Sequence, residues 1–163
     1  MVPRMGENPS EGLREERLVF GGITIVIRLR AEDSGGAMTV LEEVEPMSDT
    51  PLHVHSREDE LFYIVEGEHV FTLGEKEHRL RPGEAIFCPR GIPHAQHRVE
   101  PGAGRELVVL TPGGFEQFFR DLAEAERVGT LRAGRLRRGL RARRPHLALT
   151  PGPLSRRPAG CCG

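Results

Sequence analysis

Turn-forming residues divide the central part of the sequence into short apolar runs, and this spacing limits the fold more than any other feature. The chain contains 20 glycines and 13 prolines in 163 residues. Turn signals separate eight apolar, β-branched runs, at residues 19–30, 37–44, 52–55, 60–65, 69–73, 85–88, 94–99 and 106–110. Short strands at this spacing predict an all-β fold, either an antiparallel sandwich or a barrel.

One helix is predicted after the last of these runs, over residues 115–127. Phe115, Phe118, Phe119 and Leu122 recur at the spacing that places side chains on one face of a helix. We expect this apolar stripe to seal an open edge or end of the barrel. The alternative is that it forms part of a lid or wall over a ligand pocket.

The charge of the chain is divided unevenly between two regions. The formal net charge is −1, but residues 1–128 hold all 24 acidic residues with 14 basic ones, whereas residues 129–163 hold nine arginines and no acid. We interpret residues 1–17 as a flexible arm, 18–128 as the barrel with its helix, and 129–163 as a disordered arginine-rich tail. The abrupt loss of acids is also consistent with a shifted reading frame.

Composition disfavours several classes of protein. No apolar run approaches the roughly 20 residues that cross a bilayer, and the polar N-terminus lacks the apolar segment of a secretory signal. A cytoplasmic protein without a membrane partner is therefore expected. The basic tail has no interleaved aromatic residue for base stacking, so nucleic acid is not an expected partner. Three cysteines are too few for a disulfide framework, and Cys88 is predicted to be a buried, reduced thiol.

Two clusters of residues in the barrel region contain histidine and glutamate side chains of the kind that bind metals. His53 and His55 are two residues apart, so in a strand they project from the same face. Glu60 opens the next predicted strand, which would run back beside the first. His94 follows a Pro-x-Gly turn and opens a later strand. Three imidazoles and one carboxylate suit a divalent transition metal, namely iron, manganese, nickel, cobalt, copper or zinc.

The same strand geometry indicates which side chains would line the barrel interior. Phe62 and Ile64 share the face of Glu60, while Tyr63 points the other way. Candidate walls of a ligand pocket are Phe62, Ile64, Phe71, Phe87, Gln96 and Arg98. The remaining histidines lack a paired ligand and are predicted not to bind the metal: His69, His78, His97 and His146.

The two clusters resemble the two motifs of the cupin superfamily. The first motif, Gly-x5-His-x-His-x3–4-Glu-x6-Gly, is matched by His53, His55, Glu60 and Gly67, with Met47 in place of the leading glycine. The second, Gly-x5-Pro-x-Gly-x2-His-x3-Asn, is matched by Gly83, Pro89, Gly91 and His94, with Arg98 in place of asparagine. The resemblance covers residues 18–127. It implies a jelly-roll β-barrel that holds one metal through His53, His55, Glu60 and His94.

Residues 51–67 are most similar to small bacterial cupins of the quercetin 2,3-dioxygenase type. This likeness implies a metal-dependent dioxygenase acting on a small aromatic or enolic compound, with Glu60 as catalytic general base. A non-catalytic binding or sensing module, an isomerase or a hydrolytic metalloenzyme could use the same site. Arg98 would favour an anionic ligand. Small cupins commonly pair through their outer sheet, so a homodimer is expected.

Overall fold

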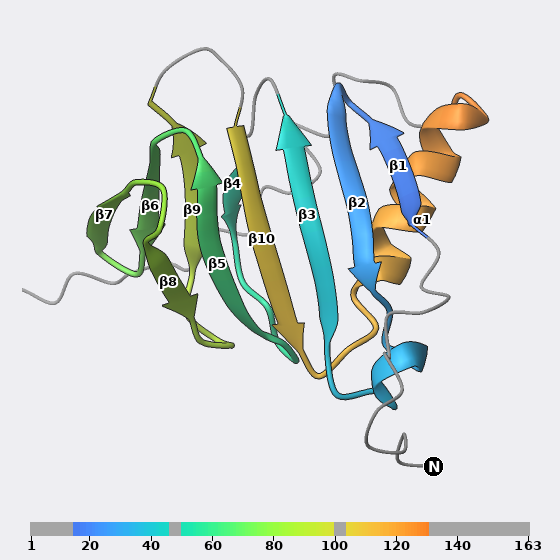
Figure 1. The fold of residues 1–163 in the computed structure, drawn as a ribbon, viewed down its shortest axis with the longest axis horizontal. Helices are drawn as coiled ribbons and strands as arrows, with labels where there is room; N and C mark the ends of the chain where they lie inside the picture. Colours follow the sequence, from blue (N-terminus) through green and yellow to red (C-terminus); the bar gives the residue numbers. More distant parts are fainter. Residues whose placement is uncertain (1–14, 46–49, 100–103, 131–163) are drawn as a thin grey trace, which may run out of the picture.

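The strands and the single α-helix of the computed structural model lie in residues 15–45, 50–99 and 104–130, which are the residues described below (Figure 1). The strands are β1 (Glu16–Phe20), β2 (Ile23–Leu29), β3 (Thr39–Glu45), β4 (Thr50–His53), β5 (Asp59–Glu66), β6 (His69–Leu73), β7 (Lys76–Leu80), β8 (Ala85–Cys88), β9 (His94–Arg98) and β10 (Gly104–Thr111). A short 3-10 helix, η1 (Glu32–Ser34), links β2 to β3, and α1 (Glu116–Arg127) follows β10.

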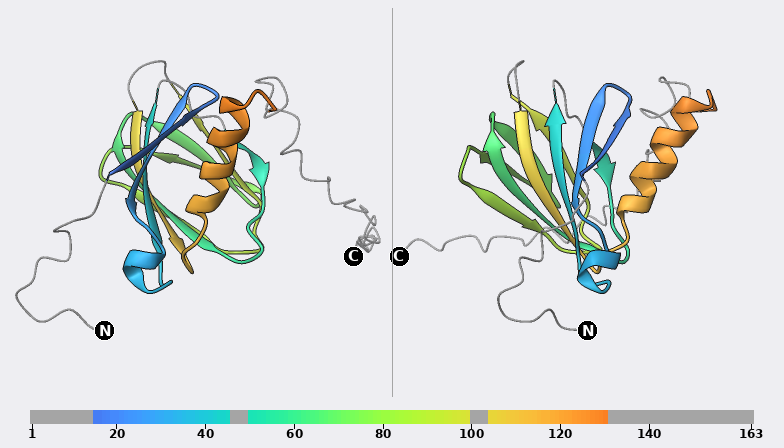
Figure 2. Two further views of the ribbon diagram at one scale, coloured as in Figure 1. Left: turned by 90° about the vertical axis from the view of Figure 1, so that its right-hand side faces the viewer. Right: turned by 45° about the vertical axis from the view of Figure 1, so that its right-hand side comes forward.

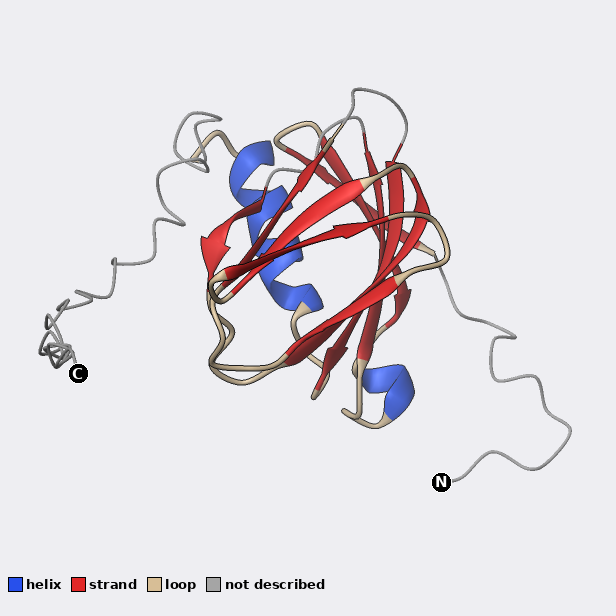
Figure 3. Cartoon of the chain, turned by 90° about the vertical axis from the view of Figure 1, so that its left-hand side faces the viewer, coloured by secondary structure: helices blue, strands red, loops and turns tan. Residues whose placement is uncertain are grey.

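The strands form two antiparallel sheets that face each other (Figures 1 and 3). One sheet has the order β1-β2-β3-β10-β5-β8, and the other has the order β4-β9-β6-β7. Strands distant in sequence are neighbours, as where β10 pairs with both β3 and β5. The fold is the predicted all-β jelly-roll barrel. None of the described helices is long and apolar enough to cross a membrane.

Two parts of the strand pattern differ from the prediction. The run 19–30 is two strands rather than one, because Gly21 and Gly22 adopt positive φ angles of 57° and 83° and reverse the chain. Strand β7 was not predicted, because its residues are charged and mostly exposed. The predicted tail and most of the predicted arm, with Cys161, Cys162 and His146, lie outside the described residues, so the proposed division of the chain stays a prediction.

The core fills the space between the two sheets with inward-facing side chains. On β5, Phe62 and Ile64 are buried while Tyr63 is exposed, as the alternation predicts. Phe71 on β6 and Cys88 on β8 are fully buried, and the Cys88 thiol is free. The complete cluster of buried apolar side chains comprises Phe20, Ile25, Ile27, Leu41, Phe62, Ile64, Phe71, Ile86, Cys88, Val108 and Leu110.

Helix α1 covers the side of the barrel where β1 and β4 end the two sheets (Figure 2). Phe115, which precedes the helix, and Phe119 and Leu122 within it pack against the core, as the apolar stripe predicts. Phe118 differs, because part of its ring is exposed. The helix therefore seals an open edge of the barrel.

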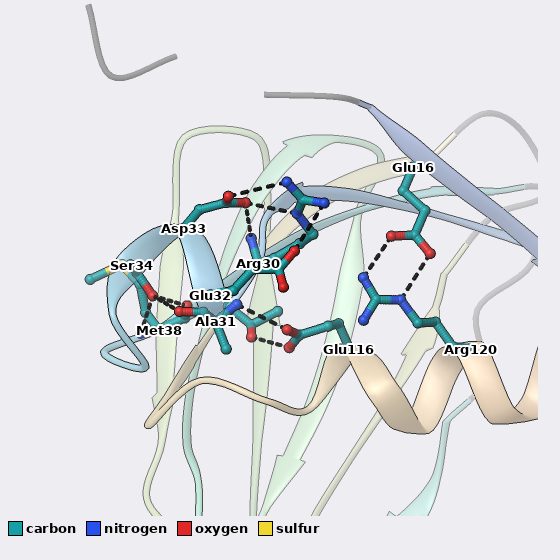
Figure 4. Close-up of polar contacts among 10 residues, drawn as sticks. Glu16, Arg30, Ala31, Glu32, Asp33, Ser34, Met38, Glu116 and Arg120 are labelled. Atoms are coloured by element: carbon teal, nitrogen blue, oxygen red, sulfur yellow. Dashed lines mark hydrogen bonds and ion pairs between the residues drawn. The ribbon is translucent and has the colours of Figure 1, made fainter. Parts of the chain in front are cut away.

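Carboxylates and an arginine fix this helix to the strands (Figure 4). The buried Glu116 carboxylate accepts hydrogen bonds from the Thr39 hydroxyl and from the backbone nitrogen of Ala31, the latter at 2.9 Å. One turn further on, Arg120 forms a 2.7 Å ion pair with Glu16 of β1. These contacts hold the start of α1 beside the end of the barrel at which the predicted metal ligands lie.

Candidate metal centre

The four predicted ligands come from three strands and one connecting segment at the same end of the barrel. His53 is the last residue of β4 and lies opposite His94, the first residue of β9. His55 follows β4 by two residues, and Glu60 is the second residue of β5. Ordinary strand pairing thus joins residues that are 41 positions apart in the sequence, His53 and His94.

The potential donor atoms of these residues form one tight group. One nitrogen of each imidazole and one oxygen of Glu60 all lie within 4.8 Å of one another. The Glu60 Oε2 atom lies 3.0 Å from Nε2 of His94 and 3.3 Å from Nε2 of His55. His55, Glu60 and His94 are buried, whereas His53 is partly exposed. Within the described residues, this is the only group of three or more histidine, cysteine or acidic side chains arranged to hold a metal.

Backbone carbonyls orient two of the three imidazoles. His53 Nδ1 lies 2.8 Å from the Pro51 carbonyl, and His94 Nδ1 lies 3.0 Å from the Ile92 carbonyl. A carbonyl can only accept, so each Nδ1 carries the hydrogen and each Nε2 faces the centre. His55 is placed differently. Its Nδ1 lies 3.8 Å from the buried Glu58 carboxylate.

The protonation behaviour of the group matches a cation-binding site. Burial lowers the pKa of His53, which favours the neutral imidazole that metals require. Burial acts to raise the pKa of Glu60, but hydrogen bonds with His55 and His94 outweigh it, and the net pKa is lowered. For His94, burial is outweighed by the hydrogen bond to Glu60, so its pKa is raised. The neutral His53 imidazole and the ionised Glu60 carboxylate are the forms in which these groups bind a divalent ion.

Comparison with known proteins places this geometry in a family. The sequence matches the cupin domain profile over residues 40–114, a range that includes all four donors. Residues 40–114 form a cupin domain. Its strands and its pair of antiparallel sheets agree with that membership, as does the ligand set that the two motifs imply.

Among its relatives, this cupin is 29% identical over 110 residues to quercetin 2,3-dioxygenase of Bacillus subtilis. That match covers 67% of this chain but 32% of the Bacillus enzyme. In fold, it is similar to KdgF from Halomonas sp., with 20% identity, a TM-score of 0.54 and coverage of 66% of this chain and 93% of that one. It is also similar to the Mn(II)-containing oxalate decarboxylase of Bacillus subtilis, with 18% identity, a TM-score of 0.55 and coverage of 64% and 29%.

Apolar groups surround the centre of this cupin. The Phe115 ring packs edge-on against His55 at 4.7 Å, so the segment before α1 shields one ligand. Phe62 lies beyond His94, with its ring tilted against that of Phe71 at 4.9 Å.

Cys88 is opposite Glu60 in the strand pairing. Burial, with a smaller effect from Glu60, raises the pKa of the Cys88 thiol to about 12, so the thiol is protonated at neutral pH.

The remaining predicted site residues divide into two groups. Phe62, Ile64, Phe71 and Gln96 face the interior of the cupin barrel, and Arg98 lies against Gly104. The prediction for Phe87 is wrong, because its ring is 54% exposed on the outer face of the sheet. On β8 it is Ile86 and Cys88 that point inward, since alternate residues of a strand face opposite ways.

Glu58 is a residue of this site that the sequence did not single out, because it lies in a charged connection typical of a solvated turn. Its carboxylate is buried beside His55 Nδ1. We expect Glu58→Ala to weaken metal binding by up to about 10-fold, because its carboxylate lies 3.8 Å from His55 Nδ1, too far for a hydrogen bond, and acts on the centre through its negative charge. Competition with a metallochromic chelator would measure the change. Glu75→Ala, a change in an exposed turn, is the matched control; equal affinity of both variants would contradict the role of Glu58.

Proposed function

We propose that this cupin is a metal-dependent dioxygenase acting on a small aromatic or enolic compound. The observation that carries the proposal is the convergence of three imidazole nitrogens and the Glu60 carboxylate within 4.8 Å. Four protein donors leave one or two positions of a five- or six-coordinate ion for ligand oxygen. The similarity to the Bacillus dioxygenase supports the reaction type.

The chain's own residues would bind, orient and move a proton. When bound, the metal would supply Lewis-acid polarisation and a template for oxygen atoms of the substrate. Glu60 is the one carboxylate among the four donors, so it is the group able to accept a proton from an enol or phenol hydroxyl. Phe62, Phe71 and the protonated Cys88 thiol provide an apolar interior that excludes water from the reacting group.

Oxygen consumption tests the proposal. Protein loaded with iron, nickel or manganese is mixed with a panel of flavonols, β-diketones and catechols in an oxygen electrode. We expect uptake with at least one substrate class and one metal, and loss of that uptake in Glu60→Ala. Binding of a panel compound without oxygen uptake under any of the three metals would instead favour a non-catalytic binding module.

We further propose that two copies of the chain associate through the outer face of the larger sheet. Leu61 and Tyr63 of β5 and Phe87 of β8 are exposed there and form an apolar patch, because Leu61 pairs directly with Phe87. Contiguous exposed apolar groups on a protein surface commonly mark interaction sites. The same alternation that removes Phe87 from the barrel interior places it in this patch.

The patch predicts that the protein is a dimer in solution and that charged substitutions in the patch separate it into single chains. Replacing Tyr63 and Phe87 together by glutamate would bury like charges at a two-fold interface, and we expect the mass in size-exclusion chromatography with light scattering to fall from two chains to one. Val19→Glu places the same charge outside the patch, on β1 at the opposite edge of the same sheet from β8, and is expected to leave the mass unchanged. A wild-type protein that runs as one chain would contradict the proposed dimer.

A further inference from the structure

Two of the predicted metal ligands, Glu60 and His94, lie on different sheets. Glu60 is on β5 of the larger sheet, and His94 opens β9 of the smaller one. Ladder hydrogen bonds fix distances within a sheet, but they do not set how far apart two facing sheets lie. The separation of these two ligands therefore depends on contacts that cross from one sheet to the other.

The turn between β8 and β9 makes such a crossing, because β8 belongs to the larger sheet and β9 to the smaller one. Arg90 lies in this turn, and its guanidinium binds the carboxylate of Asp59, the residue directly before Glu60. Nε donates to Oδ1 at 3.0 Å, Nη2 donates to Oδ2 at 2.6 Å, and the Arg90 backbone nitrogen also donates to Oδ1 at 2.9 Å. Two parallel bonds between planar groups fix orientation as well as distance, so the pair holds the turn to the start of β5.

The same turn is also bound to the segment that carries His55. The Gly91 backbone nitrogen donates a hydrogen bond to the His55 carbonyl at 2.8 Å. Gly91 adopts a positive φ angle of 79°, a conformation that favours glycine. Next in the chain, the Ile92 carbonyl accepts the hydrogen bond from His94 Nδ1 that orients this imidazole. The turn therefore connects the backbone at His55 and the side chain of Asp59 to the ring of His94.

The Asp59–Arg90 pair differs from other surface ion pairs in what it joins. The Arg90 and Asp59 side chains are 50% and 25% exposed, and ion pairs at such exposure contribute little to folding stability. Arg127 binds Glu124 with the same geometry, through Nε and Nη2 at 2.7 and 2.6 Å, but both residues lie in the last turn of α1, which the helix already holds in place. The Asp59–Arg90 pair instead joins segments from two sheets, so its effect is expected at the ligands rather than in the stability of the fold.

We propose that Asp59 and Arg90 are positioning residues that hold His94 where it can share a metal ion with the other donors. They act through the turn, since neither side chain is among the converging donors. The inference rests on the metal-binding part of the proposed function and is independent of the reaction. It predicts that loss of either residue changes the geometry of the bound ion and weakens its binding, while the barrel stays folded.

Cobalt(II) provides the test, because its visible absorption depends on the number and arrangement of its ligands. Each variant is titrated with cobalt(II) in competition with a metallochromic chelator, and the spectrum of the bound ion is recorded. We expect Arg90→Ala to bind cobalt about 3- to 10-fold more weakly than wild type and to shift the spectrum, a smaller loss than that of a group bonded directly to a ligand. Asp59→Ala also loses the bond from the backbone of residue 90, so its loss of affinity should be at least as large. Thermal melts of the metal-free variants should stay close to that of wild type.

An effect of charge alone predicts a different pattern. Removing the Asp59 anion would weaken cation binding, but removing the Arg90 cation would strengthen it. A positioning pair instead gives losses of affinity in both single variants, and the double variant Asp59→Ala with Arg90→Ala should bind no more weakly than Asp59→Ala. Arg90→Lys retains the positive charge but not the two-point contact, so it should also lose affinity, and it serves if Arg90→Ala does not fold.

The control removes an ion pair of matched geometry from α1, through Glu124→Ala with Arg127→Ala, and should retain wild-type affinity and spectrum. A folded Arg90→Ala or Arg90→Lys variant with wild-type affinity or an unchanged spectrum would overturn the inference and leave the metal centre intact, as would an equal loss in the control. Opposite effects of Asp59→Ala and Arg90→Ala would also overturn it, in favour of a purely electrostatic role. If wild-type protein binds no cobalt, the metal centre itself fails and the inference falls with it.

Discussion

Replacing His53 and His94 together by alanine is expected to remove the metal from the purified protein. The two imidazoles supply two of the four converging donors, and they come from the paired ends of β4 and β9. Loss of a residue that merely orients a ligand weakens metal binding by about 10- to 100-fold, and loss of two direct ligands should exceed that. Elemental analysis should show the metal content falling from about one ion per chain to background.

The matched control for this double variant is His78→Ala with His97→Ala. Both of these histidines are exposed on strands of the same sheet, so the control removes the same number of imidazoles without touching the centre. Its metal content should equal that of the wild type. A thermal melt of each variant checks that the barrel is folded. Unchanged metal content in a folded His53 and His94 variant would refute the assignment of the ligands.

The second large effect is a dependence of stability on pH that originates in Glu106. The pKa of this carboxyl is raised from 4.5 to about 7 in the folded protein, first because it is buried and also because Glu60 lies within electrostatic range. Hydrogen bonds from Gln96 and Glu43 and the charge of Arg98 act in the opposite direction. His69 also faces Glu106, but its ring is neutral near pH 7 because burial lowers its pKa.

The sign follows from proton binding. Between pH 4.5 and about 7 the folded chain holds a proton on Glu106 that the unfolded chain has released. Stability therefore falls as the pH rises through this range, by up to about 3 kcal/mol for a shift of this size. Above pH 7 both states are ionised and this contribution no longer changes.

Urea denaturation between pH 5 and pH 8 would measure the effect. Glu106→Gln cannot ionise, so the difference in unfolding free energy between wild type and this variant should shift by about 2–3 kcal/mol across the range. In this difference between the two unfolding free energies, the contribution from titration of the predicted metal-binding histidines cancels, because both proteins contain them. Glu77→Gln, at an exposed position on β7, is the control. A constant difference for Glu106→Gln would contradict the raised pKa of Glu106.

Sequence patterns predicted the parts of this protein that depend on local periodicity. The i and i+2 spacing of His53 and His55 and the turn before His94 were sufficient to predict which histidines converge with Glu60, because strand alternation and a motif define their positions. The inward faces of Phe62 and Ile64 were predicted by the same alternation. Phe87 was placed wrongly because a four-residue apolar run does not reveal which of its two faces is buried.

Residues that depend on contacts between distant strands were not predictable from one sequence. His69 and Glu106 appear as ordinary polar residues until β6 and β10 are seen to enclose them in the barrel. Glu116 looks like a solvated helix residue, yet it is buried and bound to Thr39, which lies 77 positions away. Strand β7 was not predicted, because an edge strand need not show the apolar alternation that is typical of a core strand.

The edge strands of the two sheets affect how readily the protein aggregates. A strand at the edge of a sheet offers unpaired backbone groups that can recruit another chain and start aggregation. Here β1 and β4 lie under α1, β7 carries charged exposed side chains, and β8 is only four residues long. Protection of the first two edges depends on a helix held by a few side-chain contacts. Shortening the protein before residue 116 would therefore expose two strands to neighbouring molecules, even with every residue of the metal centre still present.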